Sequence, residues 1–352
     1  AVGAWAGLTG VASALGPVVG GVLVGGAPWG WRLVFLINLP LAVVVVLAAR
    51  HIPETRDESV DGHIDFVGAA FAATGLAAVI YGLTEGSSFG WGARQLGATA
   101  LGVVLLAVFA AVELHERTPM LPMRLFRSRQ FTAANAVTVI VYGALGGVFF
   151  LVPVELQQGA GFSPVEAGAS LLPVTAMLLL LSARMGRIAA RRGPRLQMAV
   201  GPILAATGVA LLTRIHPGVS YVPAVLPGVL VFGVGMAVTV APLTATVMAA
   251  APPGDVGVAS AVNNDLARTA ALFAVAVLPA LSGITALAYK SPTALSNGFH
   301  NAAWIAATLC ALGGVLAGVF IRNDVLAGTT RGAVPGQAGD GSTPEVPEVS
   351  AS

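Results

Sequence analysis

The sequence predicts an all-α membrane protein, built as a bundle of helices that cross the bilayer repeatedly. Hydrophobic residues make up 56% of the 352 residues, charged residues only 10%, and the mean hydropathy is +0.84. Soluble proteins carry about 25% charged residues, because their surfaces face water. The apolar residues form continuous runs near the length that crosses about 30 Å of hydrocarbon as a helix. Such runs exclude a transmembrane β-barrel, whose strands alternate.

Ten apolar windows predict ten membrane spans. In chain order the windows are 1–31, 33–49, 66–84, 95–112, 130–154, 167–183, 196–213, 215–254, 269–289 and 291–321. The polar segment 51–63 is long enough to link two membrane units. The tail 322–352 is rich in Gly, Pro, Ser, Thr and Glu, and we expect it to be disordered because it has little apolar surface to bury.

The positions of the basic residues predict the orientation of the chain. With ten spans, fourteen of the 18 Lys and Arg residues fall on the side that holds both chain ends. Cytoplasmic loops carry an excess of Lys and Arg. We therefore expect both ends and the Arg-rich loops to be cytoplasmic, in a multi-pass protein of the cell membrane.

The composition also limits the chemistry. The single cysteine, Cys310, excludes an internal disulfide and a cysteine-based metal cluster. The five His residues fall at loops or predicted helix ends without metal-ligand spacing, and neither GxSxG nor GxxxxGK[ST] occurs. We expect no catalytic residue, no metal, no bound cofactor and no nucleic-acid partner. A membrane-embedded enzyme is a remote alternative.

The first window carries a pattern of small residues. Ala12, Gly16 and Gly20 recur every four residues and share one helix face, where a neighbouring backbone can approach closely. Pro17 removes a backbone hydrogen bond and favours a bend, and Gly21 adds a further small position. On its own this pattern is typical of ordinary packing between membrane helices.

The segment that follows makes the pattern specific. Arg32, Asn38 and Pro40 lie in WRLVFLINLP, and the whole stretch 7–40 resembles the antiporter-signature helix and its successor in the major facilitator superfamily. The likeness is closest to the fourteen-spanner drug:proton antiporter subfamily. Further similar motifs are IDFxG at 64–68, LFR and FTAAN within 125–135, GFSPxEAG at 161–168 with LP at 172–173, and GxAS at 257–260 with Asn263 and Arg268.

The resemblance implies an architecture. The ten spans would be spans five to fourteen of a fourteen-helix carrier, a major facilitator fold lacking its first four helices. The implied parts are the last two helices of the N-terminal half (1–50), a cytoplasmic linker (51–63), an inserted helix pair (64–115), the C-terminal six-helix half with its leading cytoplasmic loop (116–321) and a cytoplasmic tail (322–352).

The resemblance also implies an activity. The protein would export small amphipathic compounds or drugs in exchange for protons by alternating access, with the proton gradient as its energy source. Its partners would be the small-molecule substrate, protons and the lipid bilayer, and the sequence indicates no particular accessory protein. A proton-coupled importer of a sugar or metabolite on the same fold remains the alternative.

A basic loop resembles the second copy of the superfamily's short loop motif, for which the resemblance implies a role in gating the inner mouth. Its matching residues are Gly186, Arg187, Arg191, Gly193 and Arg195. Gly193 permits a tight turn between two helices, and the arginines hold that turn at the membrane surface. The usual acidic position is Ala190, so an aspartate-based latch is not expected. A purely positive-inside anchor is the alternative.

Polar side chains in the spans or at their entries are candidates for cavity or proton contacts, because intramembrane charge is rare unless it is used. Glu155, near the outer end of its span, is the first candidate, and Asn135, Asn263 and Arg268 complete the set. An interfacial or capping role is the alternative for Glu155, and packing between helices is the alternative for Asn135. Asp65 is expected to complement a helix N-terminus. The resemblance places the usual proton-coupling residues before this chain begins.

Overall fold

The computed structural model describes residues 16, 18–50, 65–115 and 123–326. Nine helical segments in this part are long and apolar enough to cross a membrane. Each of the windows from 33–49 onward overlaps one of these segments, so the expected membrane helix bundle is confirmed. The window 1–31 lies mostly outside the described residues, and within it residues 18–26 are helical.

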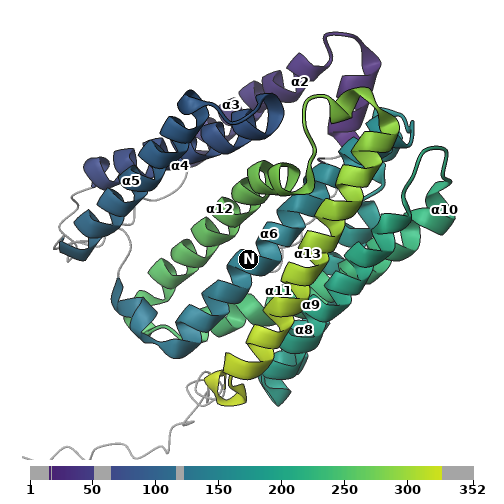
Figure 1. The fold of residues 1–352 in the computed structure, drawn as a ribbon. Helices are drawn as coiled ribbons and strands as arrows, with labels where there is room; N and C mark the ends of the chain where they lie inside the picture. The colour runs from purple at the N-terminus through teal and green to yellow at the C-terminus, as the bar shows by residue number, and fades with distance from the viewer. Residues whose placement is uncertain (1–15, 17, 51–64, 116–122, 327–352) are drawn as a thin grey trace, which may run out of the picture.

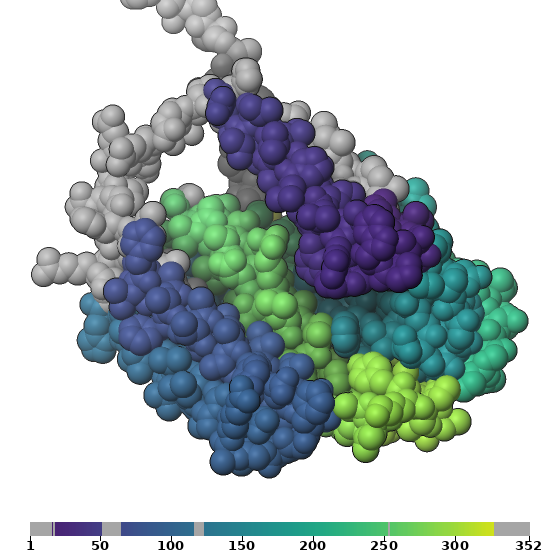
Figure 2. All heavy atoms as spheres, turned by 90° about the horizontal axis from the view of Figure 1, so that it is seen from above, coloured from purple at the N-terminus to yellow at the C-terminus, as the bar shows by residue number. Residues whose placement is uncertain are grey.

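The second span is divided into two helices that bury nothing. Helix α2 (Trp31–Leu36) is followed after one residue by α3 (Asn38–Ala49), and neither contains a buried residue. Seen from above, the surface is hollowed between segment 18–50 and helix α12 (Figure 2). These helices therefore stand apart from the packed core.

Helices α4 (Phe66–Phe89) and α5 (Ala93–His115) form an antiparallel pair whose backbones touch. A Cβ atom on Gly102 would lie 2.6 Å from the carbonyl oxygen of Gly75, so only glycine fits at this crossing. The Asp65 side chain caps α4 by accepting a hydrogen bond of 2.8 Å from the Gly68 amide, which confirms its predicted place.

Six further spans form a tightly packed bundle. They contain α6 (Arg129–Val154), α8 (Leu172–Arg192), α9 (Arg195–Leu211), α11 (Leu226–Ala249), α12 (Val256–Ser282) and α13 (Pro292–Phe320). Helix α9 packs against α11 and α13, α6 packs against α12 and α13, and α8 packs against α11. Figure 1 shows the α4–α5 pair on one side of α12 and the rest of the bundle on the other.

The predicted window 269–289 is wrong. Helix α12 begins at Val256 and ends at Ser282, so it starts thirteen residues earlier than the window. A charge-free window cannot extend past Arg268, whereas the small buried residues Ala259, Ala267 and Ala274 continue the helical spacing on both sides of it. The consequence is that a charged residue moves from a helix end to a helix middle.

Two other predicted boundaries differ from the structure. The window 215–254 is too long, because α11 is preceded by the separate short helix α10 (Tyr221–Ala224). The predicted disorder of the tail is wrong for its first residues. Asn323–Leu326 forms a 3-10 helix, and Leu326 is buried. The remainder of the tail lies outside the described residues.

Candidate functional site

The middle of α12 carries an acid and a base. Asp265 and Arg268 are the tenth and thirteenth of the 27 residues of this helix, which is about 40 Å long at 1.5 Å per residue. Both are exposed, and among the described residues neither side chain forms an ion pair or a hydrogen bond. Charges at such a depth are rare and usually face a cavity or a partner.

Arg268 was placed at the cytoplasmic helix end by the sequence, and Asp265 was missed. Both errors have one cause, since the predicted span began only after Arg268. The 3.6-residue spacing of small residues from Ala259 to Ala274 is the signal that locates both of them inside the helix.

Asp265 and Arg268 line a pocket of about 420 Å³ between α12 and the α4–α5 pair. Leu76 of α4 and Phe109 of α5 lie in the opposite walls, and Thr269 of α12 is a third polar lining residue. The pocket therefore combines two apolar walls with a third wall, from α12, that carries all of its polar lining residues among apolar ones. Its lining residues on α12 run from Ala261 to Leu272, which includes the middle of the helix.

Asn263 lies on the other face of α12. Its amide donates hydrogen bonds to Asn135 Oδ1 (3.0 Å) and to Thr138 Oγ1 (2.7 Å), both on α6. All three side chains are buried. The structure thus brings the two predicted asparagines together, as a contact between helices, and it places Arg268 outside their group.

Glu155 lies far from this group. It follows the last residue of α6, twenty residues beyond Asn135, in a π-helical turn (Glu155–Gly159) next to Pro153. Its side chain is fully buried. One carboxyl oxygen accepts a hydrogen bond from Ser296 of α13, and the other has no hydrogen-bond partner among the described residues. The structure therefore ties the ends of α6 and α13 together at Glu155.

The signature residues are only partly within the described chain, since Ala12 and Pro17 lie outside it. Gly21 is buried, and a Cβ atom there would lie 2.7 Å from the carbonyl oxygen of Pro164, at the start of α7 (Pro164–Ala169). Gly16 and Gly20 have no described atom within 4 Å of such a Cβ. Close backbone approach is therefore seen at Gly21.

The residues of the following helix make local contacts. The Arg32 guanidinium lies 5.3 Å from the centre of the Trp31 ring. Asn38 donates hydrogen bonds to the carbonyls of Val34 (3.2 Å) and Phe35 (3.3 Å). Pro40, in the first turn of α3, has no amide hydrogen to give. Asn38 thus supplies donors at the break between α2 and α3.

The basic loop is a turn between α8 and α9. Gly193 has a φ of +84°, which favours glycine, as the tight turn requires. The Arg195 side chain donates a hydrogen bond of 2.7 Å to the carbonyl of Gly318, and its amide donates one of 3.2 Å to Asn323 Oδ1. The turn is thereby attached to the end of α13. Three further motif residues, Gly186, Arg187 and Arg191, lie in the last two turns of α8.

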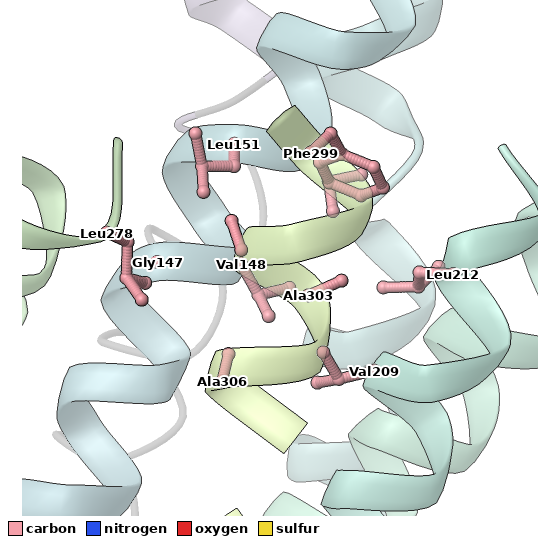
Figure 3. A pocket seen from close by; sticks show the side chains of 11 residues that line it. Gly147, Val148, Leu151, Val209, Leu212, Leu278, Phe299, Ala303 and Ala306 are labelled. Atoms are coloured by element: carbon pink, nitrogen blue, oxygen red, sulfur yellow. The ribbon is translucent and has the colours of Figure 1, made fainter. Parts of the chain in front are cut away.

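A second cavity lies inside the bundle between α6, α9, α12 and α13 (Figure 3). It is only about 10 Å³ in volume, and its lining side chains are apolar, as Val148, Leu212 and Phe299 illustrate. A cavity of this size holds at most one water molecule, which needs polar partners. It is a packing void. Among the described residues, no group of three or more His, Cys, Asp or Glu could hold a metal ion.

The arrangement of a helix bundle with an intramembrane charged pair agrees with a family match. Residues 1–276 match the Major Facilitator Superfamily. The chain belongs to this superfamily. The resemblance seen in its motifs is therefore confirmed, and its helices belong to a multi-pass membrane transporter fold.

Curated relatives within the superfamily include several resistance proteins. The tetracenomycin C resistance and export protein of Streptomyces glaucescens is 31% identical over 80% of this chain and 52% of its own length. The methylenomycin A resistance protein of Bacillus subtilis is 33% identical over 82% of this chain and 61% of its own length. The puromycin resistance protein of Streptomyces alboniger is 31% identical over 85% of this chain and 60% of its own length. The chain thus spans about half to three fifths of these curated relatives.

Proposed function

We propose that the protein exports small amphipathic organic compounds or drugs in exchange for protons, by alternating access. Membership in the superfamily and the export and resistance roles by which the relatives are named support export. The observation that carries the proposal is the pair Asp265 and Arg268 near the middle of α12, facing a pocket of about 420 Å³. A membrane carrier binds its substrate near the bilayer midplane.

We propose the same parts that the motifs imply: helices of the N-terminal half in 1–50, an inserted pair in 64–115 and the C-terminal half in 116–321. Both chain ends would face the cytoplasm from the cell membrane. Removing Arg268 from the 18 basic residues leaves thirteen on the cytoplasmic side and four on the other. The positive-inside bias is nearly unchanged.

In this arrangement the signature residues would shape the contact between the two halves and limit leakage. The close approach of Gly21 to Pro164 supports that role, because it joins the first helix to the C-terminal half. The basic loop would control the inner mouth through its attachment by Arg195 to the end of α13.

The test is transport of the uncharged lipophilic dye Nile red by the full-length protein in everted membrane vesicles. An exporter accumulates the dye inside such vesicles when a pH gradient is imposed, and a protonophore abolishes the accumulation. Accumulation that ignores the collapsed gradient would contradict proton exchange. If instead a sugar or metabolite makes the medium of intact cells more alkaline, the importer alternative is correct.

A further inference from the structure

The pocket between α12 and the α4–α5 pair has a clear division of chemistry. All lining residues from α4 and α5 are apolar, for example Leu76 on α4 and Leu106 on α5. The polar lining residues are Asp265, Arg268 and Thr269, and all of them come from α12. A molecule that fits both surfaces has an apolar body with polar groups along one edge.

The side chains of Asp265 and Arg268 require water or a polar group beside them. They lie near the middle of a membrane helix, both are exposed, and among the described residues no ion pair joins them to each other or to another side chain. Leaving them against lipid tails is costly, so such groups face water-filled cavities or bound polar groups. The pocket beside them offers that space.

The opposite charges of Asp265 and Arg268 determine which polar group of a ligand fits beside them. Residues three apart on a helix are neighbours, about 5–6 Å between Cβ atoms. A cation attracted by Asp265 is repelled by Arg268 at a similar distance. An anion is attracted by Arg268 and repelled by Asp265. A carboxylate accepts hydrogen bonds and a guanidinium only donates them. The pair therefore suits an uncharged edge that presents a donor next to an acceptor.

We propose that this pocket binds uncharged amphipathic compounds in which a hydroxyl group stands beside a carbonyl group. The hydroxyl donates to Asp265, the carbonyl accepts from Arg268, and the apolar body lies against α4 and α5. This inference names the class of substrate and therefore rests on the proposed function. Binding to the pocket can still be measured without transport.

The test uses binding to the purified full-length protein with four probes. Quinizarin is an uncharged aromatic compound with hydroxyls beside carbonyls, and anthraquinone is the matched compound without the hydroxyls. Tetraphenylphosphonium and tetraphenylborate are matched in shape and opposite in charge. We expect the unmodified protein to bind quinizarin at least tenfold more tightly than the other three.

The variants D265N and R268Q then separate the two charges. Each is expected to weaken quinizarin binding about tenfold. R268Q should strengthen binding of tetraphenylphosphonium at least threefold, because Asp265 is left alone, and D265N should do the same for tetraphenylborate. A72F, which fills the pocket from α4, should weaken binding of all four probes.

The matched control removes the same charges elsewhere. Arg322 and Asp324 form an exposed ion pair of 2.7 Å beyond α13, so R322Q and D324N should leave every affinity unchanged. Protection of the buried thiol of Cys310 reports that each variant is folded.

Charge variants that leave the order of the four probes unchanged would overturn the proposal, as would A72F binding quinizarin like the unmodified protein while Cys310 stays protected. Dye export that continues with an unchanged probe order refutes this site and leaves the proposed function standing. If the probes bind in the predicted order but the protein exports no dye, the proposed function is refuted and the binding site stands.

Discussion

The two faces of α12 hold polar side chains in opposite ways. Asn263 is buried and hydrogen-bonded to α6, whereas Asp265 and Arg268 are exposed and form no hydrogen bond or ion pair among the described residues. At 3.6 residues per turn, Asp265 and Arg268 point about 160° and 140° away from Asn263 around the helix axis. One face joins two helices, and the other faces a pocket.

The comparison teaches that this membrane helix uses polar side chains in two ways, one on each face. An amide can satisfy its hydrogen bonds with neighbouring side chains and so holds helices together. A charged group needs water, a counter-charge or a ligand. The predictions that follow break or sharpen this difference, in order of decreasing expected effect.

The largest effect is expected from loss of the base on the pocket face. Arg268→Ala should lower proton-driven Nile red export at least tenfold, because Asp265 is left without a compensating charge beside the substrate. The unfolding temperature should stay the same, since Arg268 has no described partner to lose. Vesicle transport and thermal unfolding measure the two quantities, with Arg322→Ala as the control. A lowered unfolding temperature with normal export would assign Arg268 to the packing face instead.

The wall opposite α12 should be sensitive to size. Gly102→Ala places a Cβ atom 2.6 Å from the Gly75 carbonyl oxygen and must push α4 and α5 apart. We expect it to lower the free energy of unfolding by about 1–3 kcal/mol. Gly97→Ala is the matched control, because no described atom lies within 4 Å of a Cβ atom at that position of α5. Denaturation in mixed micelles measures both, and equal stability of the two variants would disprove the close contact.

The buried face should respond in stability and hardly at all in transport. Asn263→Leu leaves Asn135 and Thr138 on α6 without their donor, and hydrogen bonds between membrane helices are worth about 1 kcal/mol. We expect a loss of that size in the free energy of unfolding, with export retained. Combining it with Asn135→Ala should add little, because both remove the same contact. Additive losses would show that the two side chains do not interact.

The smallest effect is expected at the end of α12. Arg124 and Asp255 form an ion pair of 2.6 Å just before the first turn, in which the Arg124 side chain is 67% exposed and the Asp255 side chain 15%. Exposed ion pairs contribute at most about 1 kcal/mol and are screened by salt. Asp255→Asn should therefore lower stability by less than that in dilute buffer and by nothing in molar salt. A loss that persists in molar salt would point to a different role for Asp255.

Much of the bundle could be predicted because hydropathy is a local property. The apolar runs located nine described spans, and Asp65 and Gly193 were correctly placed at a helix start and a tight turn. The predictions failed where charged or polar residues belong to a helix or to a packed contact. Arg268 ended a window although its helix continues, and the first tail residues were expected to be disordered although Asn323 accepts a hydrogen bond from Arg195.

The candidate site was less predictable, because its members come from distant parts of the chain. Asn135 was singled out inside an apolar span and Asn263 in a motif at the entry to another, yet their pairing depends on how α6 packs against α12. Glu155 belonged to the same predicted set, and the structure places it at the far end of α6 beside Ser296. Asp265 was absent from the set.

The sequence by itself determined that the protein crosses a membrane many times and that it resembles the superfamily to which it belongs. Both follow from consecutive residues, through runs of hydropathy and short motifs. Only the tertiary structure decided that Asp265 and Arg268 share a pocket with α4 and α5, while Asn263 faces α6. A pocket is made by helices that are distant along the chain, and the direction of a side chain depends on which neighbour each helix face meets.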